Sequence, residues 1–275
     1  MPCWYSFKRE RVDYVRSTEM KKKLMAVGLG LFMLLAVAIP QMNAWADENT
    51  KTVDIMFLHD THSHLNAFTT IENDTSVTMG GFSRIKTLIN EQMAENPETL
   101  VLDAGDFAMG TLVQVVYEEE AAELRMLGEI GVEATTLGNH EFDYKAKGLS
   151  NMMNTAVASG DTLPAMLLCN MDWDAMHASG LTEDQQMILD AFENYGVKDY
   201  TVIEKDGVKI AVIGVFGKDA EACVAQCPVT FRDPVEAVKE TVAEIEANED
   251  VDMMVCPCCC IHLFQMSGTH TDRVN

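Results

Sequence analysis

The sequence predicts an α/β fold, because short apolar runs alternate along it with segments of helical periodicity. Polar residues follow three of the apolar runs at their carboxyl ends, which is where α/β proteins build their sites. No glycine-rich phosphate loop of the Walker or dinucleotide-binding kind accompanies these runs. The fold is therefore expected to carry a site made of side chains at strand ends.

The expected elements follow from local composition. Apolar and β-branched runs predict strands at residues 53–58, 99–102, 133–137, 164–169, 199–204, 208–214 and 251–256. Helical spacing of apolar residues predicts helices at 82–93, 118–130, about 145–158 and 235–247. Gly131 is expected to end the second helix, and Asp206-Gly207 predicts a tight hairpin. Three glutamates at 118–120 are expected to form a solvated first turn.

The first part of the chain has the pattern of a secretory leader. Residues 20–23 are Met-Lys-Lys-Lys, residues 24–39 are uninterrupted apolar sequence, and Ala44-Trp45-Ala46 has small residues where a signal peptidase reads. We expect a leader over 1–46 with its signal peptide at 20–46, cleavage after Ala46, and export to a periplasm, cell surface or extracellular space. An uncleaved membrane anchor is the alternative, but the apolar run is short for a membrane span. Contact with a membrane is expected only through this segment before cleavage.

The charge of the remaining chain limits its partners. After residue 46 there are 13 basic and 40 acidic residues, a net charge of −27. Such acidity disfavours nucleic acid polymers and anionic membranes as partners. An anionic small molecule would need bound cations to be attracted.

The most informative segment is Leu137-Gly138-Asn139-His140-Glu141-Phe142-Asp143, which follows the expected strand 133–137. It offers an amide oxygen, an imidazole and a carboxylate within five residues. His140 and Asp143 are three residues apart, so one helical turn places both on one face. There the carboxylate can hold the imidazole in one tautomer, as general acid–base chemistry requires.

Two further strand ends carry similar chemistry. Asp60 and His62 follow the first expected strand and, on extended backbone, would point to the same side as a metal clasp. Gly105-Asp106 follows the second. The number of residues between successive motifs fits one strand–helix–strand unit or slightly more. The joint occurrence of the three motifs is improbable by chance. The sequence therefore predicts one site made from three strand ends.

The set of motifs resembles the calcineurin-like metallophosphoesterases. The Gly-Asn-His-Glu-Phe-Asp form at 138–143 and Met79-Gly80-Gly81-Phe82-Ser83-Arg84 resemble more narrowly the secreted bacterial 5′-nucleotidase and 2′,3′-cyclic phosphodiesterase branch. The resemblance covers about residues 53–256. It implies a four-layer α/β/β/α sandwich of the metallo-dependent phosphatase type, with a metallophosphoesterase domain at 47–256.

The same resemblance implies a role for each matching residue. Asp60 and His62 would ligate a first metal, Asp106 would bridge two metals, and Asn139 would ligate the second. Asn139 and His140 would contact the substrate phosphate, and Asp143 would orient His140. The implied cofactors are two divalent ions such as zinc or manganese, and the implied substrate is a nucleotide or another small phosphate ester. His59 and His64 have no matching family role and are expected to be structural or supporting residues.

The chain departs from the family pattern near its end. The family has a histidine in a Ser-His-x-Gly context and two more in Gly-His-x-His, whereas this chain has Cys256-Pro257-Cys258-Cys259-Cys260. Neither His262 nor His270 matches. We interpret 257–275 as an aberrant cysteine-rich tail of a truncated or frameshifted gene, with the fold incomplete at the C-terminus and a weak second metal site. Three functions stay open: a 5′-nucleotidase, a 2′,3′-cyclic nucleotide phosphodiesterase, and a non-catalytic fragment that binds at most one metal.

Overall fold

The computed structural model describes residues 8–15, 50–258 and 261–266, and the side chains of 51–258. Its strands are β1 Lys8–Val15, β2 Thr50–Leu58, β3 Phe68–Glu72, β4 Thr75–Met79, β5 Leu100–Asp103, β6 Ala134–Thr135, β7 Ala165–Met166, β8 Tyr200–Lys205, β9 Val208–Ile213, β10 Met253–Cys258 and β11 Ile261–Met266. Its helices are α1 Phe82–Glu95, α2 Tyr117–Glu120, α3 Ala122–Ile130, α4 Lys145–Ser159, α5 Trp173–Ser179, α6 Glu183–Tyr195, α7 Lys218–Cys223 and α8 Pro234–Asn248, with 3₁₀ turns η1 Leu112–Val116 and η2 Asn139–Phe142.

Two sheets organise the described chain. The first has the order β1-β2-β5-β6-β7, in which β2, β5, β6 and β7 are parallel and β1 pairs antiparallel with β2. The second has the order β11-β10-β9-β8, with β9 and β10 parallel and the other two pairs antiparallel. β3 and β4 form a separate hairpin. Because β2, β5 and β6 are parallel, their carboxyl ends meet at one edge of the first sheet.

The alternation of side chains along the strands explains how the two sheets stack. One face of the first sheet meets one face of the second sheet in a shared apolar core. Its buried members are Val53, Ile55, Phe57, Leu100, Leu102, Ala104, Ala134, Leu167, Val208, Ile210, Val212, Met253 and Val255. Residues one position away on the same strands, such as Met56 and Ala211, belong to other clusters. This period of two gives each sheet an inner and an outer face.

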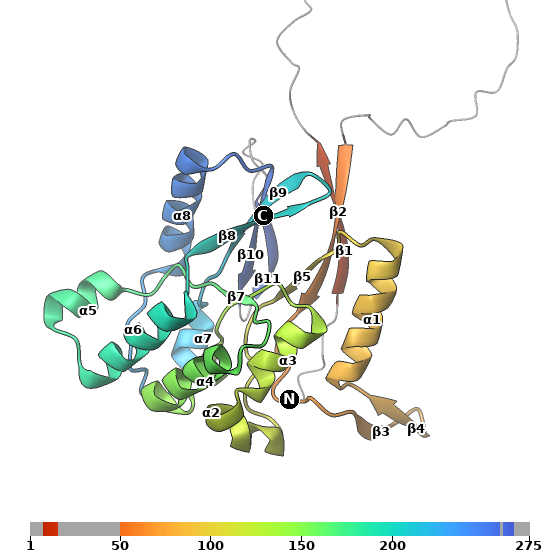
Figure 1. Ribbon diagram of the computed structural model, residues 1–275, viewed down its shortest axis with the longest axis horizontal. Coiled ribbons are helices and arrows are strands. Elements are labelled where there is room, and N and C mark those ends of the chain that lie inside the picture. The colour runs from red at the N-terminus through yellow and green to blue at the C-terminus, as the bar shows by residue number, and fades with distance from the viewer. Residues whose placement is uncertain (1–7, 16–49, 259–260, 267–275) are drawn as a thin grey trace, which may run out of the picture.

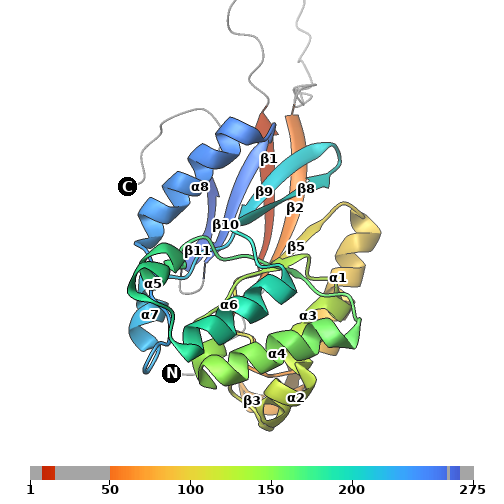
Figure 2. The ribbon, with the colours of Figure 1, turned by 60° about the vertical axis from the view of Figure 1, so that its left-hand side comes forward.

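Helices cover both outer faces. Met56, Leu58 and Val101 pack in one cluster with apolar residues of α1, α3, α4 and α6. On the other side, Ala237 and Ile245 of α8 pack on Ala211, Ile213 and Met254. Figure 1 shows the resulting succession from α8 through the two sheets to α1, and Figure 2 shows α8 lying across the second sheet. The predicted α/β/β/α sandwich is therefore confirmed.

All the predicted strands and three of the four predicted helices are present, with shifted ends. β6 and β7 are much shorter than predicted, since each chain segment leaves the sheet to enter a site loop or a neighbouring turn. Asp206 and Gly207 form the predicted hairpin turn with φ values of 49° and 66°. Gly131 ends α3 in the left-handed conformation, as predicted.

The predicted single helix 118–130 is wrong, because the chain breaks at Ala121. This residue has φ 46° and ψ 38°, so α2 ends there and α3 begins at the next residue. The break lets α2 lie on α4, where Asn151 donates to the Glu118 carboxylate at 3.1 Å and Thr155 donates to the Glu118 carbonyl at 3.0 Å. Glu118 is thus half-buried and hydrogen-bonded rather than solvated, whereas Glu119 and Glu120 are exposed as expected.

Several elements were not predicted from the sequence. The β3–β4 hairpin turns at Asn73-Asp74, whose φ values are 49° and 60°, and most of its side chains are exposed. Helices α5, α6 and α7 fill the connections on either side of the second sheet's first hairpin. The hairpin is exposed and α5 and α7 are short, so these elements lack a long apolar stripe. α6 does bury Ile188, Ala191 and Phe192 at helical spacing, so its sequence carries a helix signal that the prediction missed.

The end of the described chain continues the second sheet. β10 runs through Pro257 to Cys258, and β11, inside the segment interpreted as an aberrant tail, pairs antiparallel with it. Cys256 and Cys258 are buried in the apolar cluster that α8 covers. The predicted signal peptide at 20–46, Cys259 and Cys260 lie outside the described residues, whereas β1 lies inside the predicted leader. No helix in the described part of the chain combines the length and apolarity that crossing a bilayer requires.

Candidate metal centre

The site begins where β2 and β5 end, because the two following loops continue side by side. The Asp60 amide donates to the Gly105 carbonyl at 3.1 Å, the His62 amide donates to the Asp106 carbonyl at 3.1 Å, and the Ser63 amide donates to the Phe107 carbonyl at 2.7 Å. These bonds extend the parallel pairing of the strands beyond the sheet. They bring the first two motifs together although more than forty residues separate them.

Both loops contain residues with left-handed backbone. Asp60, His62 and Ser63 have φ values of 53°, 44° and 54°, and Asp106 and Met109 have 55° and 60°. Each such residue costs on the order of 1 kcal/mol or more, and such residues concentrate at functional sites. The expectation that Asp60 and His62 lie on extended backbone is therefore wrong, since the loop needs tight turns to follow its neighbour.

The third motif joins the other two through a glycine contact. A Cβ placed on Gly138 would lie 2.2 Å from the Asp106 Oδ1 atom, so no larger residue fits. The His140 amide donates to that same Oδ1 atom at 2.9 Å. A Cβ on Gly105, whose φ is 85°, would lie 2.6 Å from the Gly138 amide nitrogen. The glycines of the two motifs thus allow the Asp106 and His140 loops to touch.

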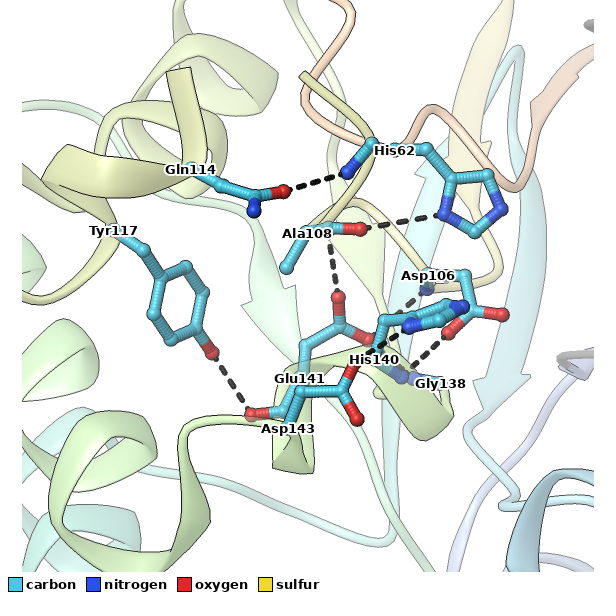
Figure 3. Close-up of polar contacts among 10 residues, drawn as sticks. His62, Asp106, Ala108, Gln114, Tyr117, Gly138, His140, Glu141 and Asp143 are labelled. Atoms are coloured by element: carbon cyan, nitrogen blue, oxygen red, sulfur yellow. Dashed lines mark hydrogen bonds and ion pairs between the residues drawn. The ribbon is translucent and has the colours of Figure 1, made fainter. Parts of the chain in front are cut away.

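Three side chains converge where these loops meet. His62, Asp106 and His140 each offer a ligand atom, and these atoms all lie within 4.8 Å of one another. Figure 3 shows the two imidazoles and the carboxylate turned toward one region, and the His62 and His140 rings meet edge to face at 5.0 Å. His62 Nδ1 lies 3.3 Å from the Ala108 carbonyl, which leaves its Nε2 atom available as a ligand. Two imidazoles and one carboxylate suit zinc, manganese or iron, so these residues fit a divalent metal.

His140 and Asp143 form the pair that their spacing predicts. His140 Nδ1 lies 2.7 Å from Asp143 Oδ2, and both side chains are about one third exposed. η2 supplies the helical turn that brings them together. The family resemblance implies that His140 contacts the substrate phosphate, and the structure brings its ring close enough to His62 and Asp106 for the three residues to hold one metal ion.

Asp60 and Asn139 occupy the margins of this cluster. Asp60 Oδ2 lies 2.8 Å from His59 Nδ1. Burial alone would raise the pKa of Asp60, but the His59 hydrogen bond and the charges of His59 and His62 hold it below its ordinary value. Asn139 is a buried residue that opens η2, between Gly138 and His140. Asp60 is not one of the three residues whose ligand atoms all lie within 4.8 Å of one another.

Glu141 lies within the third motif, whose sequence indicates no role for it, and the structure shows that it joins the site loops. It is fully buried and accepts hydrogen bonds from the amides of Asp106, Ala108 and Gly138 at 3.0, 2.9 and 2.6 Å. Burial and the charge of Asp106 raise the pKa of Glu141, while the three amide bonds act in the opposite direction. Glu141 lies three residues after Gly138, the N-cap of η2, which is the position from which a glutamate can accept the N-cap amide, so this spacing could have indicated the bond to Gly138.

Asp103 is a second buried carboxyl group that the sequence did not single out. It ends β5, and its Oδ2 atom accepts from the Gly105 amide at 2.9 Å and from the Thr135 hydroxyl at 2.6 Å. Burial raises the pKa of Asp103 to about 7 despite these two bonds. Asp103 therefore fixes the turn that leads to Asp106.

Phe142 packs the third motif against the segments that follow β9 and α7. Its ring meets Phe216 edge to face at 5.5 Å and Phe231 at 6.0 Å, and these two rings stack at 4.4 Å. Such aromatic contacts contribute about 1 kcal/mol each beyond the area that they bury. η2 is thus held from both sides, by Phe142 and by Glu141.

Among the described residues, the other histidines and cysteines are not part of the three-residue group. His59 pairs with Asp60, and His64 Nδ1 lies 3.3 Å from the Thr61 carbonyl. Cys256 is buried in the apolar cluster that α8 covers. Within the residues that the structure describes, His62, Asp106 and His140 form the one group of histidine, cysteine and carboxylate residues that could hold a metal ion.

Comparison with known proteins identifies this arrangement. The family model described as calcineurin-like phosphoesterase matches residues 53–212, more than half of the chain and all three motifs. The chain belongs to the calcineurin-like phosphoesterase family. This confirms the resemblance that the motifs suggested.

Curated relatives of this calcineurin-like phosphoesterase bear names from the nucleotidase branch. The chain is 28% identical over 195 residues to a trifunctional nucleotide phosphoesterase protein of Bacillus subtilis, which covers 66% of this chain and 13% of the relative. It is 28% identical over 205 residues to an NAD 5′-nucleotidase of Haemophilus influenzae, covering 71% and 30%. The chain therefore spans about a third or less of the length of these relatives.

Solved structures show the same fold. A 5′-nucleotidase precursor from Thermus thermophilus superposes with a TM-score of 0.59 and 24% identity, covering 74% of this chain and 36% of that one. The NAD nucleotidase of Haemophilus influenzae superposes with a TM-score of 0.56 and 24% identity, covering 74% and 33%. At this identity, the likeness concerns the fold.

Proposed function

We propose that this chain hydrolyses phosphate esters of nucleotides, as a 5′-nucleotidase, at the centre formed by its three strand-end motifs. The observation that carries the proposal is the convergence of His62, Asp106 and His140 within 4.8 Å at the edge where three parallel strands end. The family match and the names of the relatives support the reaction class and the substrate class.

Asp60, His62, Asp106 and Asn139 are the proposed ligands of two divalent ions. When bound, the ions supply positive charge that neutralises a phosphate ester and makes a nearby water more acidic. Asp106 lies at the centre of the three loops and is the proposed shared ligand. Asp106 and Asn139 alone make a poor second site, because such sites normally have four or more donors.

His140 and Asp143 perform the proposed proton chemistry. Asp143 binds Nδ1 of His140, which fixes the imidazole's orientation and leaves Nε2 facing the cluster. From there His140 stabilises charge on the phosphoryl oxygens or gives a proton to the leaving oxygen. Asn139, directly before it, is proposed to contact the same phosphate.

The charge of the chain supports cation-dependent recognition of a small anion. The whole sequence has a net charge of −23, which repels a phosphate ester unless bound cations offset it locally. A cyclic 2′,3′-phosphodiester presents the same phosphate chemistry, so this activity is the second candidate. The leader pattern supports export, with residues 47–256 as the phosphoesterase domain.

One experiment separates these functions. The full 275-residue chain is purified, its metal content is measured, and hydrolysis of p-nitrophenyl phosphate, AMP and 2′,3′-cyclic AMP is followed with added Mn²⁺ or Zn²⁺. The matched control is the double variant Asp106→Asn, His140→Ala. Preferred hydrolysis of AMP that the double variant lacks supports the nucleotidase.

Two other outcomes contradict the proposed 5′-nucleotidase function. Preferred hydrolysis of the cyclic diester assigns the second candidate function. At most one metal per chain, with no hydrolysis beyond that of the double variant, shows a non-catalytic fragment.

A further inference from the structure

Glu141 lies between the loops that carry the metal-site residues. Its two carboxylate oxygens accept the amides of Asp106, Ala108 and Gly138, and its own carbonyl accepts the Tyr117 hydroxyl at 3.1 Å. Figure 3 shows the side chain extending from η2 beneath Asp106. Two of the three amides belong to the loop after β5, and the third belongs to the loop after β6.

We propose that Glu141 is the positioning residue of this centre: it binds the two loops together and so fixes the Asp106 carboxylate and the His140 imidazole relative to each other. The inference rests on the proposed function, since it assigns a role within that site. Glu141 acts through backbone amides and is not itself proposed as a ligand or a proton donor.

The chemistry of the three donors explains why a carboxylate is needed here. The Asp106 and Ala108 amides point inward from a loop with left-handed residues, where no sheet partner is available to them. Buried amides without an acceptor cost free energy, and a carboxylate can accept several at once. A glutamine would place an NH₂ group where one oxygen accepts, so at least one amide would face another donor.

The bonds also explain how Glu141 controls ligand geometry. Glu141 accepts the backbone amide of Asp106, and the Oδ1 atom of Asp106 in turn accepts the His140 amide at 2.9 Å. Glu141 also accepts the backbone amide of Gly138, and Gly138 packs against the same Oδ1 atom of Asp106. Releasing either one allows the Asp106 carboxylate to rotate away from His62 and His140.

Glu123 offers a matched control. It is also fully buried, but it bonds a site loop only through the Ser63 hydroxyl, at 2.6 Å, and its Oε2 atom has no hydrogen-bond partner in the structure. Burial raises its pKa as well. Glu123→Gln therefore makes the same change of charge and volume in the same core without removing an acceptor from the backbone amides of the site.

The test compares the full chain with Glu141→Gln, Glu141→Asp and Glu123→Gln. Mn²⁺ affinity is measured by calorimetry and by electron paramagnetic resonance, and kcat at saturating Mn²⁺ is measured with p-nitrophenyl phosphate. We expect Glu141→Gln to lower Mn²⁺ affinity and kcat by about tenfold or more, because supporting contacts of metal ligands typically have such effects. Glu141→Asp should recover part of the loss, and Glu123→Gln should stay within roughly twofold of the parent chain.

A purely structural role would give a different result. Glu141→Gln would then melt at a lower temperature while its folded form kept the parent's Mn²⁺ affinity and kcat, and this outcome overturns the inference. An equal loss in Glu123→Gln overturns it as well, because the effect would then follow any buried charge change.

Failure of the proposed function is detected separately. If the parent chain binds no Mn²⁺, amide hydrogen exchange decides whether Glu141 orders the loops. The amides of Asp106, Ala108 and Gly138 should exchange at least about tenfold faster in Glu141→Gln, while the amides of β5 should be unchanged. Unchanged exchange at all three amides overturns the positioning role whether or not the chain is an enzyme.

Discussion

Gly138 lies directly against the carboxylate of Asp106, and a Cβ at this glycine would stand 2.2 Å from the Oδ1 atom. Its φ of −107° is accessible to any residue, so the requirement for glycine is purely steric. We predict that Gly138→Ala displaces Asp106 and lowers metal affinity by at least about tenfold. Metal titration by calorimetry checks this.

Gly128 provides the control for that variant. A Cβ on Gly128 would lie 1.9 Å from the Thr162 carbonyl, a comparable clash that is remote from the site. Gly128→Ala should lower the melting temperature but leave the metal affinity of the folded protein unchanged. Equal metal affinity in Gly138→Ala and the parent chain would show that the Asp106 loop can move without consequence.

Asp106→Asn should abolish the response of the protein to divalent cations. The parent chain should melt at a higher temperature with Mn²⁺ than with EDTA, because a ligand that binds only the folded state stabilises it, by about 2.7 kcal/mol at a hundred times its Kd. Asp106→Asn should lose this increase, since Asp106 is central to the cluster. Scanning calorimetry measures both, with the exposed Asp174→Asn as control. A persisting increase would place the ion elsewhere.

His140→Ala should reduce hydrolysis by roughly 10²–10⁴-fold, the range for a positioned acid or base. Asp143→Asn should reduce it less, because the imidazole stays but loses the partner that lies 2.7 Å from its Nδ1 atom. Kinetics with p-nitrophenyl phosphate, and with an activated ester whose leaving group needs no proton, check the role. If His140→Ala slows both esters equally, His140 acts on the phosphoryl oxygens or the metal rather than on the leaving oxygen.

The metal-free protein should lose stability as pH rises because of Asp103. The pKa of this buried carboxyl is about 7 in the folded protein against an ordinary 3.8. A group with a raised folded pKa stabilises most below the unfolded value, and this contribution is lost as pH rises toward the folded value. From pH 5 to pH 8 the free energy of unfolding should fall by roughly 2–3 kcal/mol from this group.

Asp103→Asn tests that pH dependence. The amide keeps an oxygen for the Gly105 amide and the Thr135 hydroxyl but does not ionise. The free energy of unfolding, measured with urea in the presence of EDTA, should therefore differ less between pH 5 and pH 8 for Asp103→Asn than for the parent chain. An unchanged difference would assign the pH dependence to other groups.

Much of the fold and of the site could be predicted from the sequence, because the signals are local. Apolar runs and helical spacing report burial within one element, so β2, α1, β5, α4 and α8 were found at nearly their observed positions. Asp60, His62, Asp106, Asn139, His140 and Asp143 were recognised because each motif is contiguous.

Only the tertiary structure decided which of these residues meet and what holds them. The left-handed turns at Asp60 and Asp106, the break at Ala121 and the amide contacts of Glu141 all depend on segments far apart along the chain. Hydrogen bonds and steric contacts between such segments form only when the sheet brings their loops together, and local periodicity carries no record of them. The sequence thus determined the chemistry available at the strand ends, whereas packing decided that His62, Asp106 and His140 share one centre.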